Sequence, residues 1–216
     1  METKTAMNNL STTPNEQITA LARKSLSGNW ALVVGATLAL CIINITLQNI
    51  SNIGPFIVFV LSGPMSLGFA CLYLTLYHHK KAGFSQIFSG FNHFIPALIA
   101  NSLITILVFL WSLLLIIPGI IAAYSYCLTF YIIYEDPSIS PIQAMKKSKL
   151  MMEGNKLKAF YLSCRFIGWL ILAILTSGIG FLWLAPYVGM SFATFYEDIK
   201  QNAVEANDKK TDTLIC

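Results

Sequence analysis

Long apolar segments alternate with short polar segments along this 216-residue chain. The clearest case is residues 95–134, where an uncharged apolar run ends at Ile117 and a second run follows the dipeptide Pro118–Gly119. A helix needs about 20 residues to span roughly 30 Å of hydrocarbon. The two runs therefore predict a transmembrane hairpin with its turn at Pro118 and Gly119.

The same pattern divides the rest of the chain. Residues 1–29 form an N-terminal segment with an amphipathic helix, and residues 197–216 form a charged tail. Between them lies a membrane domain, 30–196, with predicted spans at about 30–47, 55–77, 96–117, 119–134, 159–176 and 179–196. The expected fold class is all-α: a polytopic membrane helical bundle of six transmembrane helices in three hairpins.

The connectors between hairpins have the pattern of interfacial amphipathic helices. Residues 13–16 and 140–143 both match a capping box, with Thr13 and Ser140 as the N-cap residues. Between them, apolar residues recur at helical spacing over 84–95. We expect one such helix before each hairpin, and hence three tandem units of similar length.

Composition and charge agree with a membrane protein. Hydrophobic residues make up 56% of the chain and charged residues only 11%, against about 25% charged in soluble domains. All ten acidic residues and thirteen of the fourteen lysines and arginines fall in 1–29, 78–94, 135–158 and 197–216. The positive-inside rule then predicts a multi-pass protein with both termini cytoplasmic. A net charge of +4, dispersed in this way, does not favour a nucleic-acid partner.

Several polar groups are predicted to lie inside spans. Arg165 lies seven residues past Lys158, about 10 Å deep at 1.5 Å per residue. Its side chain either reaches back to the headgroups or pairs with Glu135 or Glu197. The other candidates, which either line a cavity or hydrogen-bond between helices, are Asn44, Asn101, Tyr124 and Tyr126.

A helix break is predicted within the second span at Gly63 and Pro64, because proline removes a backbone hydrogen bond. Such a break serves either as a packing kink or as a hinge at a binding site.

Basic residues gather in the third connector, at Lys146, Lys147, Lys149, Lys156 and Lys158. Each basic residue near an anionic membrane surface contributes about 1 kcal/mol of attraction. The expected partner is therefore a bilayer with anionic headgroups, and we also consider a membrane-protein partner or a second copy of the chain. The sequence has no nucleophile elbow, no phosphate-binding glycine loop and no metal-ligand spacing. We therefore expect no cofactor, no metal and no catalytic residue.

Specific strings in the second half of the chain resemble a known family. They lie at residues 116–126, 134–140, 148–156, 166–169 and 175–187. They closely resemble a bacterial integral-membrane family known as domain of unknown function 975. More distantly, the pattern is similar to membrane domains attached to some glycerophosphodiester phosphodiesterases. The resemblance implies a protein of the bacterial cytoplasmic membrane with about six spans, and it carries over no catalytic residue. Family members usually have a small or apolar residue at the position of Arg165.

These observations favour a non-catalytic membrane interaction or lipid-sensing protein. A small-molecule transporter or channel is the alternative, because of the repeats, the Gly63–Pro64 break and the polar residues at depth. A membrane-embedded enzyme acting on lipid headgroups is the third hypothesis.

Overall fold

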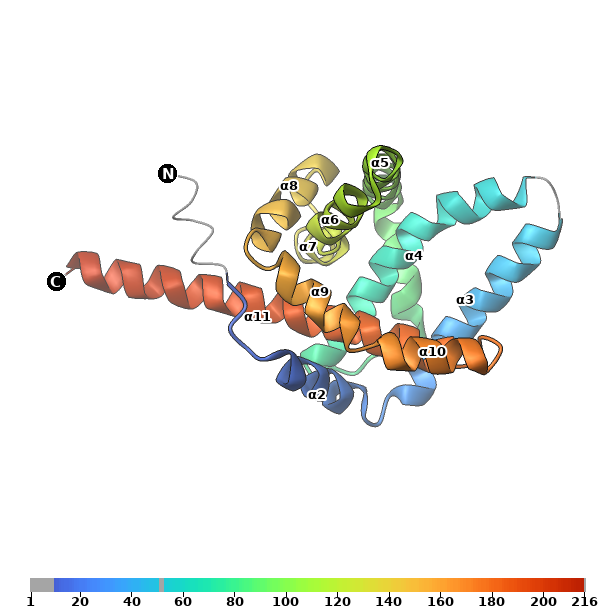
Figure 1. Ribbon diagram of the computed structural model, residues 1–216, viewed down its shortest axis with the longest axis horizontal. Helices are drawn as coiled ribbons and strands as arrows, with labels where there is room; N and C mark the ends of the chain where they lie inside the picture. Colours follow the sequence, from blue (N-terminus) through green and yellow to red (C-terminus); the bar gives the residue numbers. More distant parts are fainter. Residues whose placement is uncertain (1–9, 51–52, 216) are drawn as a thin grey trace.

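The computed structural model describes residues 10–50 and 53–215, and within them every regular element is a helix, which confirms the all-α fold class. The elements are α2 (Asn15–Leu26), α3 (Trp30–Ile50), α4 (Gly54–Tyr77), the 3-10 helix η2 (Phe84–His93), α5 (Phe94–Leu114), α6 (Ile116–Tyr126), α7 (Thr129–Glu135), α8 (Pro141–Met152), α9 (Lys156–Cys164), α10 (Ile167–Leu175) and α11 (Phe181–Ile215) (Figure 1).

The longest helix, α11, runs across the molecule and holds much of the core (Figure 1). Met190, Phe195 and Tyr196 are almost completely buried, and the helix packs against α2, α3, α4 and α10. The residues predicted to form a separate charged tail instead continue α11 as far as Ile215. Neither glycine nor proline occurs between Ser191 and Ile215, so no residue there disfavours the helix strongly enough to end it near 196.

In the part of the chain that the structure describes, five helical segments are long and apolar enough to cross a membrane, which is compatible with a multi-pass membrane protein. They are Trp30–Asn49, Gly54–Tyr77, Phe84–Leu114, Ile116–Glu135 and Lys156–Leu175. The predicted sixth span, 179–196, is not among them. It lies in α11, which buries polar side chains such as Ser191 and Thr194 in the protein core.

The turn ends of the hairpins expose large apolar side chains. Phe56 at the start of α4, Leu115 and Ile116 between α5 and α6, and Leu175 at the end of α10 are all more than two-thirds exposed. A soluble monomer rarely exposes apolar patches of this kind. Such surfaces are compatible with the hydrocarbon interior of a bilayer.

The turn between α5 and α6 lies at Leu115, not at Pro118 and Gly119 as the sequence suggested. Leu115 has extended backbone angles, with φ −160° and ψ 144°. Pro118 falls in the first turn of α6, where its missing N–H costs no hydrogen bond. A Cβ at Gly119 would collide with the Ser112 hydroxyl. Gly119 therefore permits close packing of the two helices rather than forming the turn.

Gly63 and Pro64 lie inside a continuous helix. α4 runs without interruption from Gly54 to Tyr77, although its ribbon bends between its ends (Figure 1). A Cβ at Gly63 would lie 2.7 Å from the carbonyl oxygen of Ala97. Nearby, a Cβ at Gly90 would collide with the carbonyl oxygen of Pro64. The predicted break is thus the place where α4 meets the backbones of η2 and α5.

The two predicted capping boxes differ in outcome. At Ser140 the box is confirmed: its hydroxyl accepts from the Gln143 N–H at 3.3 Å, and the Gln143 side chain accepts from the Ser140 N–H at 3.4 Å. At the other site, α2 begins at Asn15 without a side-chain cap. The Thr13 hydroxyl donates to Asp198 of α11 instead, so a tertiary contact replaces the predicted local one.

The order of elements repeats three times, with a short helix followed by a helical hairpin each time. Gly28 and Gly154 end the first and third short helices with φ of 85° and 80°, a conformation that favours glycine. Gly90 lies within η2, in close contact with α4. The middle unit therefore has the same order of elements as the other two, but its short helix does not end in a glycine turn with positive φ.

Candidate functional site

The third connector presents a basic surface on α8. Ala144, Ser148 and Met152 face the core, where the helix packs against α5, α6 and α7. The opposite side exposes three lysines and two large apolar side chains, which we name the α8 basic face: Ile142, Lys146, Lys147, Lys149 and Leu150. Cationic and apolar groups on one exposed surface are typical of membrane-surface helices.

The two remaining lysines of the predicted basic set do not belong to this face. The Lys158 ammonium donates to the backbone oxygen of Ser11 at 2.9 Å and to its hydroxyl at 2.6 Å. Lys156 is half-buried at the start of α9. Lys158 therefore binds the N-terminal segment, and the exposed lysines of the predicted set are the three on the α8 basic face.

The N-terminal segment is bound between the third connector and α11. The Ser11 N–H donates to the Asn155 side chain at 2.9 Å, and the Ser11 hydroxyl donates to Asp198. Further along, α2 lies beside α11, where the Tyr187 hydroxyl donates to the Thr19 carbonyl at 3.3 Å. The first and third units are thus joined through polar contacts.

Arg165 pairs with neither Glu135 nor Glu197. It lies at the break between α9 and α10, and its guanidinium is 3.5 Å from the Glu16 carboxylate of α2. The Arg165 side chain is 41% exposed and that of Glu16 is 81% exposed. The pair therefore marks a polar surface rather than the interior of the bundle.

The ends of the three hairpins meet in a polar cluster. Glu135 accepts from the Tyr196 hydroxyl at 2.8 Å and from the Lys200 ammonium at 2.5 Å. The His78 Nε2 lies 3.6 Å from the Glu197 carboxylate. We name these five residues the hairpin-end cluster. It joins the residue after α4, the end of α7 and the middle of α11.

Glu197 is the most buried charge-bearing residue of this cluster. Its residue exposure is 3%, and among the described residues its Oε1 has no hydrogen-bond donor. Burial raises the pKa of Glu197; the charges of Lys200 and His78 oppose the shift, and that of Glu135 adds to it. The cluster therefore contains a carboxyl group that binds a proton more readily than usual.

Local sequence patterns did not predict this cluster. The signal was the recurrence of Tyr-Glu-Asp at 134–136 and 196–198. The two copies do not form equivalent contacts. Tyr196 of the later copy donates to Glu135 of the earlier copy, and its ring stacks on Tyr131 with the centroids 5.6 Å apart.

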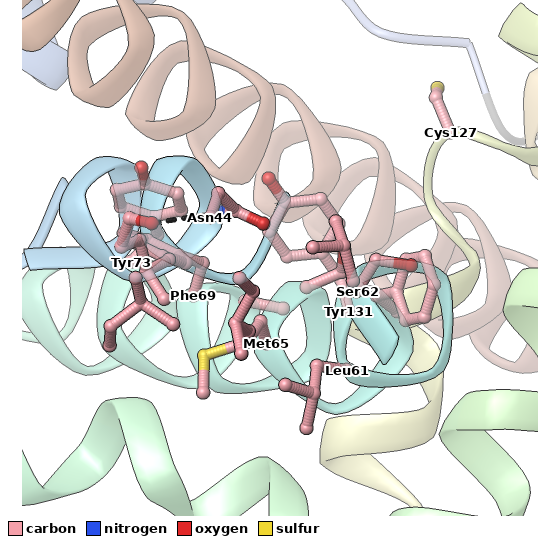
Figure 2. A pocket seen from close by; sticks show the side chains of 15 residues that line it. Asn44, Leu61, Ser62, Met65, Phe69, Tyr73, Cys127 and Tyr131 are labelled. Carbon is pink, nitrogen blue, oxygen red and sulfur yellow. Dashed lines mark hydrogen bonds between the residues drawn. The ribbon is translucent and has the colours of Figure 1, made fainter. Parts of the chain in front are cut away.

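A cavity of about 390 Å³ opens between α3, α4 and α7. Figure 2 shows Asn44 of α3 facing side chains of α4, including Ser62, Phe69 and Tyr73. Two polar side chains that line the cavity make hydrogen bonds to the backbone. The Asn44 amide donates to the Leu40 carbonyl at 2.9 Å, and the Tyr131 hydroxyl donates to the Gly189 carbonyl at 3.1 Å. The cavity is therefore mainly apolar, and these two polar groups are satisfied within the protein.

The other predicted intramembrane polar residues lie outside this cavity. Asn101 donates to the Ser62 hydroxyl at 2.8 Å, between α5 and α4. Tyr124 packs edge-on against Phe160, with ring centroids 6.2 Å apart. Tyr126 lines a separate cavity between α5 and α6. The structure does not bring the four candidates together at one site.

Among the described residues, no group of three or more His, Cys, Asp or Glu side chains is arranged to hold a metal ion. His78 binds the Leu74 carbonyl through Nδ1, at 2.7 Å.

Comparison with known proteins places the chain in a family. No curated protein and no solved structure matches it, so the likeness to glycerophosphodiester phosphodiesterase membrane domains is not shown. One family profile matches at residues 7–118 and 112–203, which together cover nearly the whole chain. The chain belongs to the family described as "Protein of unknown function (DUF975)".

Proposed function

We propose that this protein is a non-catalytic protein of the bacterial cytoplasmic membrane that senses or binds anionic lipid at its cytoplasmic surface. The observation that carries this proposal is the α8 basic face. Its lysines are exposed beside Ile142 and Leu150, while the opposite side of the helix is fixed in the core. Three well-placed lysines at an anionic leaflet would contribute about 3 kcal/mol.

We further propose that all connectors lie on the cytoplasmic side. The contacts among residues 11–13, 78, 135, 155–158 and 197–200 support this arrangement, because they bring together the N-terminal segment, the ends of the first two hairpins, and the start of α9 and the middle of α11 in the third. The positive-inside rule then assigns this side to the cytoplasm.

The third hairpin, in this proposal, enters the bilayer without crossing it. α2, with exposed Glu16 and Arg23, lies beside α11 between Tyr187 and Asp198. Arg165 is also at this level, through its pair with Glu16. The apolar part left for hydrocarbon is α10 and the start of α11. The nine residues of α10 span about 13 Å, less than half of the roughly 30 Å needed.

The lipid proposal is tested with the full-length chain, because an isolated α8 peptide would expose its core side chains. In a variant without native cysteines, Leu150→Cys carries an environment-sensitive fluorophore, and the protein is placed in nanodiscs. We expect the emission to shift to shorter wavelength as the anionic lipid fraction rises.

Two variants make this experiment specific. The triple variant K146Q/K147Q/K149Q should lose the shift, whereas K80Q/K81Q, which removes exposed lysines of another connector, should keep it. Identical spectra in zwitterionic and anionic nanodiscs would contradict the proposal.

A small-molecule transporter or channel is the second candidate function, favoured by the 390 Å³ cavity between α3, α4 and α7. In the cysteine-free background, Asn44→Cys should then react with a charged, membrane-impermeant thiol reagent. Failure to react from either side of the membrane would leave the cavity as an apolar packing feature and remove this candidate.

A further inference from the structure

A groove of about 470 Å³ lies between α2, the start of α3, α10 and α11. Its walls include three of the four tryptophans of the chain, Trp30, Trp169 and Trp183, together with Leu184. We name it the tryptophan groove. Its volume falls within the range of about 300–1,000 Å³ usual for ligand sites. One wall of the groove is α10, an apolar helix with almost all of its side chains exposed, as expected of a surface that contacts lipid.

One cation lies at the α2 end of this groove. The Arg23 guanidinium lies over the Tyr187 ring, 5.6 Å from its centroid, and donates to the Tyr187 hydroxyl at 3.3 Å. The only ion pairs among the described residues involve other groups, so no described carboxylate neutralises Arg23. A guanidinium held in this way is pre-organised for a planar or tetrahedral oxyanion.

The opposite end of the groove is apolar. Ile179 and Gly180, at the turn before α11, line this end together with Thr176, whose hydroxyl donates to the Ala173 carbonyl at 3.0 Å within α10 and its cap. Gly180 lies seven residues before Tyr187, which places it about 10 Å away along α11. The groove therefore joins a positive charge at its α2 end to a mainly apolar slot that extends to the turn between α10 and α11.

We propose that the tryptophan groove binds one acyl chain of an anionic phospholipid, with its phosphate on Arg23. This inference rests on the proposed function. It names the class of lipid, and it adds the tryptophan groove to the α8 basic face as a second site of lipid contact. A zwitterionic lipid fits the apolar slot equally well, but its headgroup carries its own cation. The net negative headgroup of the anionic lipid is what complements Arg23.

The tryptophans provide a direct readout. Trp111 on α5 lies outside the groove and is removed by Trp111→Phe, so that the remaining tryptophan fluorescence comes from the groove walls. The protein is placed in phosphatidylcholine vesicles with a small fixed fraction of lipid brominated on its acyl chains. The brominated lipid is either phosphatidylglycerol or phosphatidylcholine.

We expect the brominated phosphatidylglycerol to occupy the groove about fivefold more readily, and hence to quench more strongly; this factor corresponds to about 1 kcal/mol. Raising the ionic strength should reduce the preference. Arg23→Gln should abolish it, while Lys24→Gln, which removes the neighbouring cation, should preserve it.

Equal quenching by the two lipids in the otherwise unaltered protein would overturn the proposal without any need for Arg23→Gln to fold. A preference that survives in folded Arg23→Gln would overturn the assignment of the phosphate to Arg23. Neither result depends on α8. Failure here with a positive Leu150 probe experiment would therefore reject the groove alone, and the reverse would reject the α8 basic face alone.

Discussion

At the scale of single residues, the burial of Glu197 has the clearest energetic consequence. Its carboxylate is surrounded by the ends of three hairpins and lies near His78, Lys200 and Glu135. Taking such a group out of water disfavours its charged form unless partners compensate. The pKa of Glu197 is raised, so the nearby charges of Lys200 and His78 offset only part of the cost of removing the carboxylate from water.

The pH dependence of stability follows from that direction. A carboxyl with a raised pKa in the folded state favours folding at low pH, and this contribution is lost as the pH rises above the ordinary value of about 4.5. We expect Glu197→Gln to flatten the fall in the thermal unfolding midpoint with rising pH in detergent micelles. A midpoint that responds to pH as strongly in Glu197→Gln as in the unaltered protein would contradict this account.

Arg165 shows what a local sequence pattern leaves undecided. A charge in an apolar run predicted either a long reach to the headgroups or a partner at another hairpin end. The observed partner is Glu16, 149 positions away in sequence. Nothing in the local sequence pattern indicates that contact, because it depends on how α2 packs beside α9 and α11.

The Arg165–Glu16 pair should contribute little to stability, because both side chains are substantially exposed. We expect Arg165→Leu to change the free energy of unfolding by no more than about 1 kcal/mol, with normal insertion. Glu16→Gln should have a similarly small effect, and the double variant should show little coupling. A loss of several kcal/mol or failed insertion would show that the charge is required.

At the scale of elements, close backbone contacts join the first unit of the chain to the second. α4 meets η2 and α5 through glycines, and a Cβ at Gly68 would collide with the Ile87 carbonyl oxygen. In membranes the hydrophobic effect does not drive helices together, so their association depends on close packing. Small residues such as glycine allow the backbones of two helices to come this close.

Gly68→Ala should therefore lower the free energy of unfolding by about 1–3 kcal/mol, the usual range for overpacking. Gly35→Ala provides the matched control, because outside the adjacent backbone of its own helix no atom lies within 4 Å of a Cβ built there. Alanine also favours the helix over glycine by about 0.5–1 kcal/mol. Thermal unfolding of both variants in the same detergent tests this. Equal destabilisation by the two variants would contradict the close-contact argument.

Elements were predictable where local chemistry decides them. The Ser140 cap and the apolar helices both follow from short-range patterns. The turn at Leu115 did not, since proline is tolerated in the first turn of a helix as well as between helices. The 3-10 form of η2 was also missed, because its pattern was that of an ordinary amphipathic helix and its packing on α4 is a tertiary property.

At the scale of the whole molecule, three helical hairpins share one polar region. The hairpin-end cluster joins positions 78, 135 and 196–200, and the bound N-terminal segment adds residues 11–13. Hydropathy predicted the long apolar helices, but the cluster depends on side-chain contacts between units far apart in sequence. The candidate site was therefore predictable for the exposed lysines of α8 and not for Arg23, which had no motif around it.

The sequence predicts that the third hairpin crosses the membrane completely, whereas we propose that it enters only part of the way. Measuring how deep its turn lies in the bilayer distinguishes the two. A fluorophore on Ser177→Cys should be quenched more strongly by lipids labelled deep in the acyl chains than by lipids labelled at the headgroup. Reaction of this cysteine with an impermeant reagent from outside intact cells would instead establish a complete crossing.

The shared polar side is tested most directly by cysteine accessibility at Ser27, Ser138 and Gln201, one exposed position beside each unit. Each cysteine is placed singly in a chain without native cysteines and treated with an impermeant maleimide, in intact cells and in inside-out vesicles. All three positions are expected to react only in inside-out vesicles. Labelling of any one of them from outside intact cells would contradict the account.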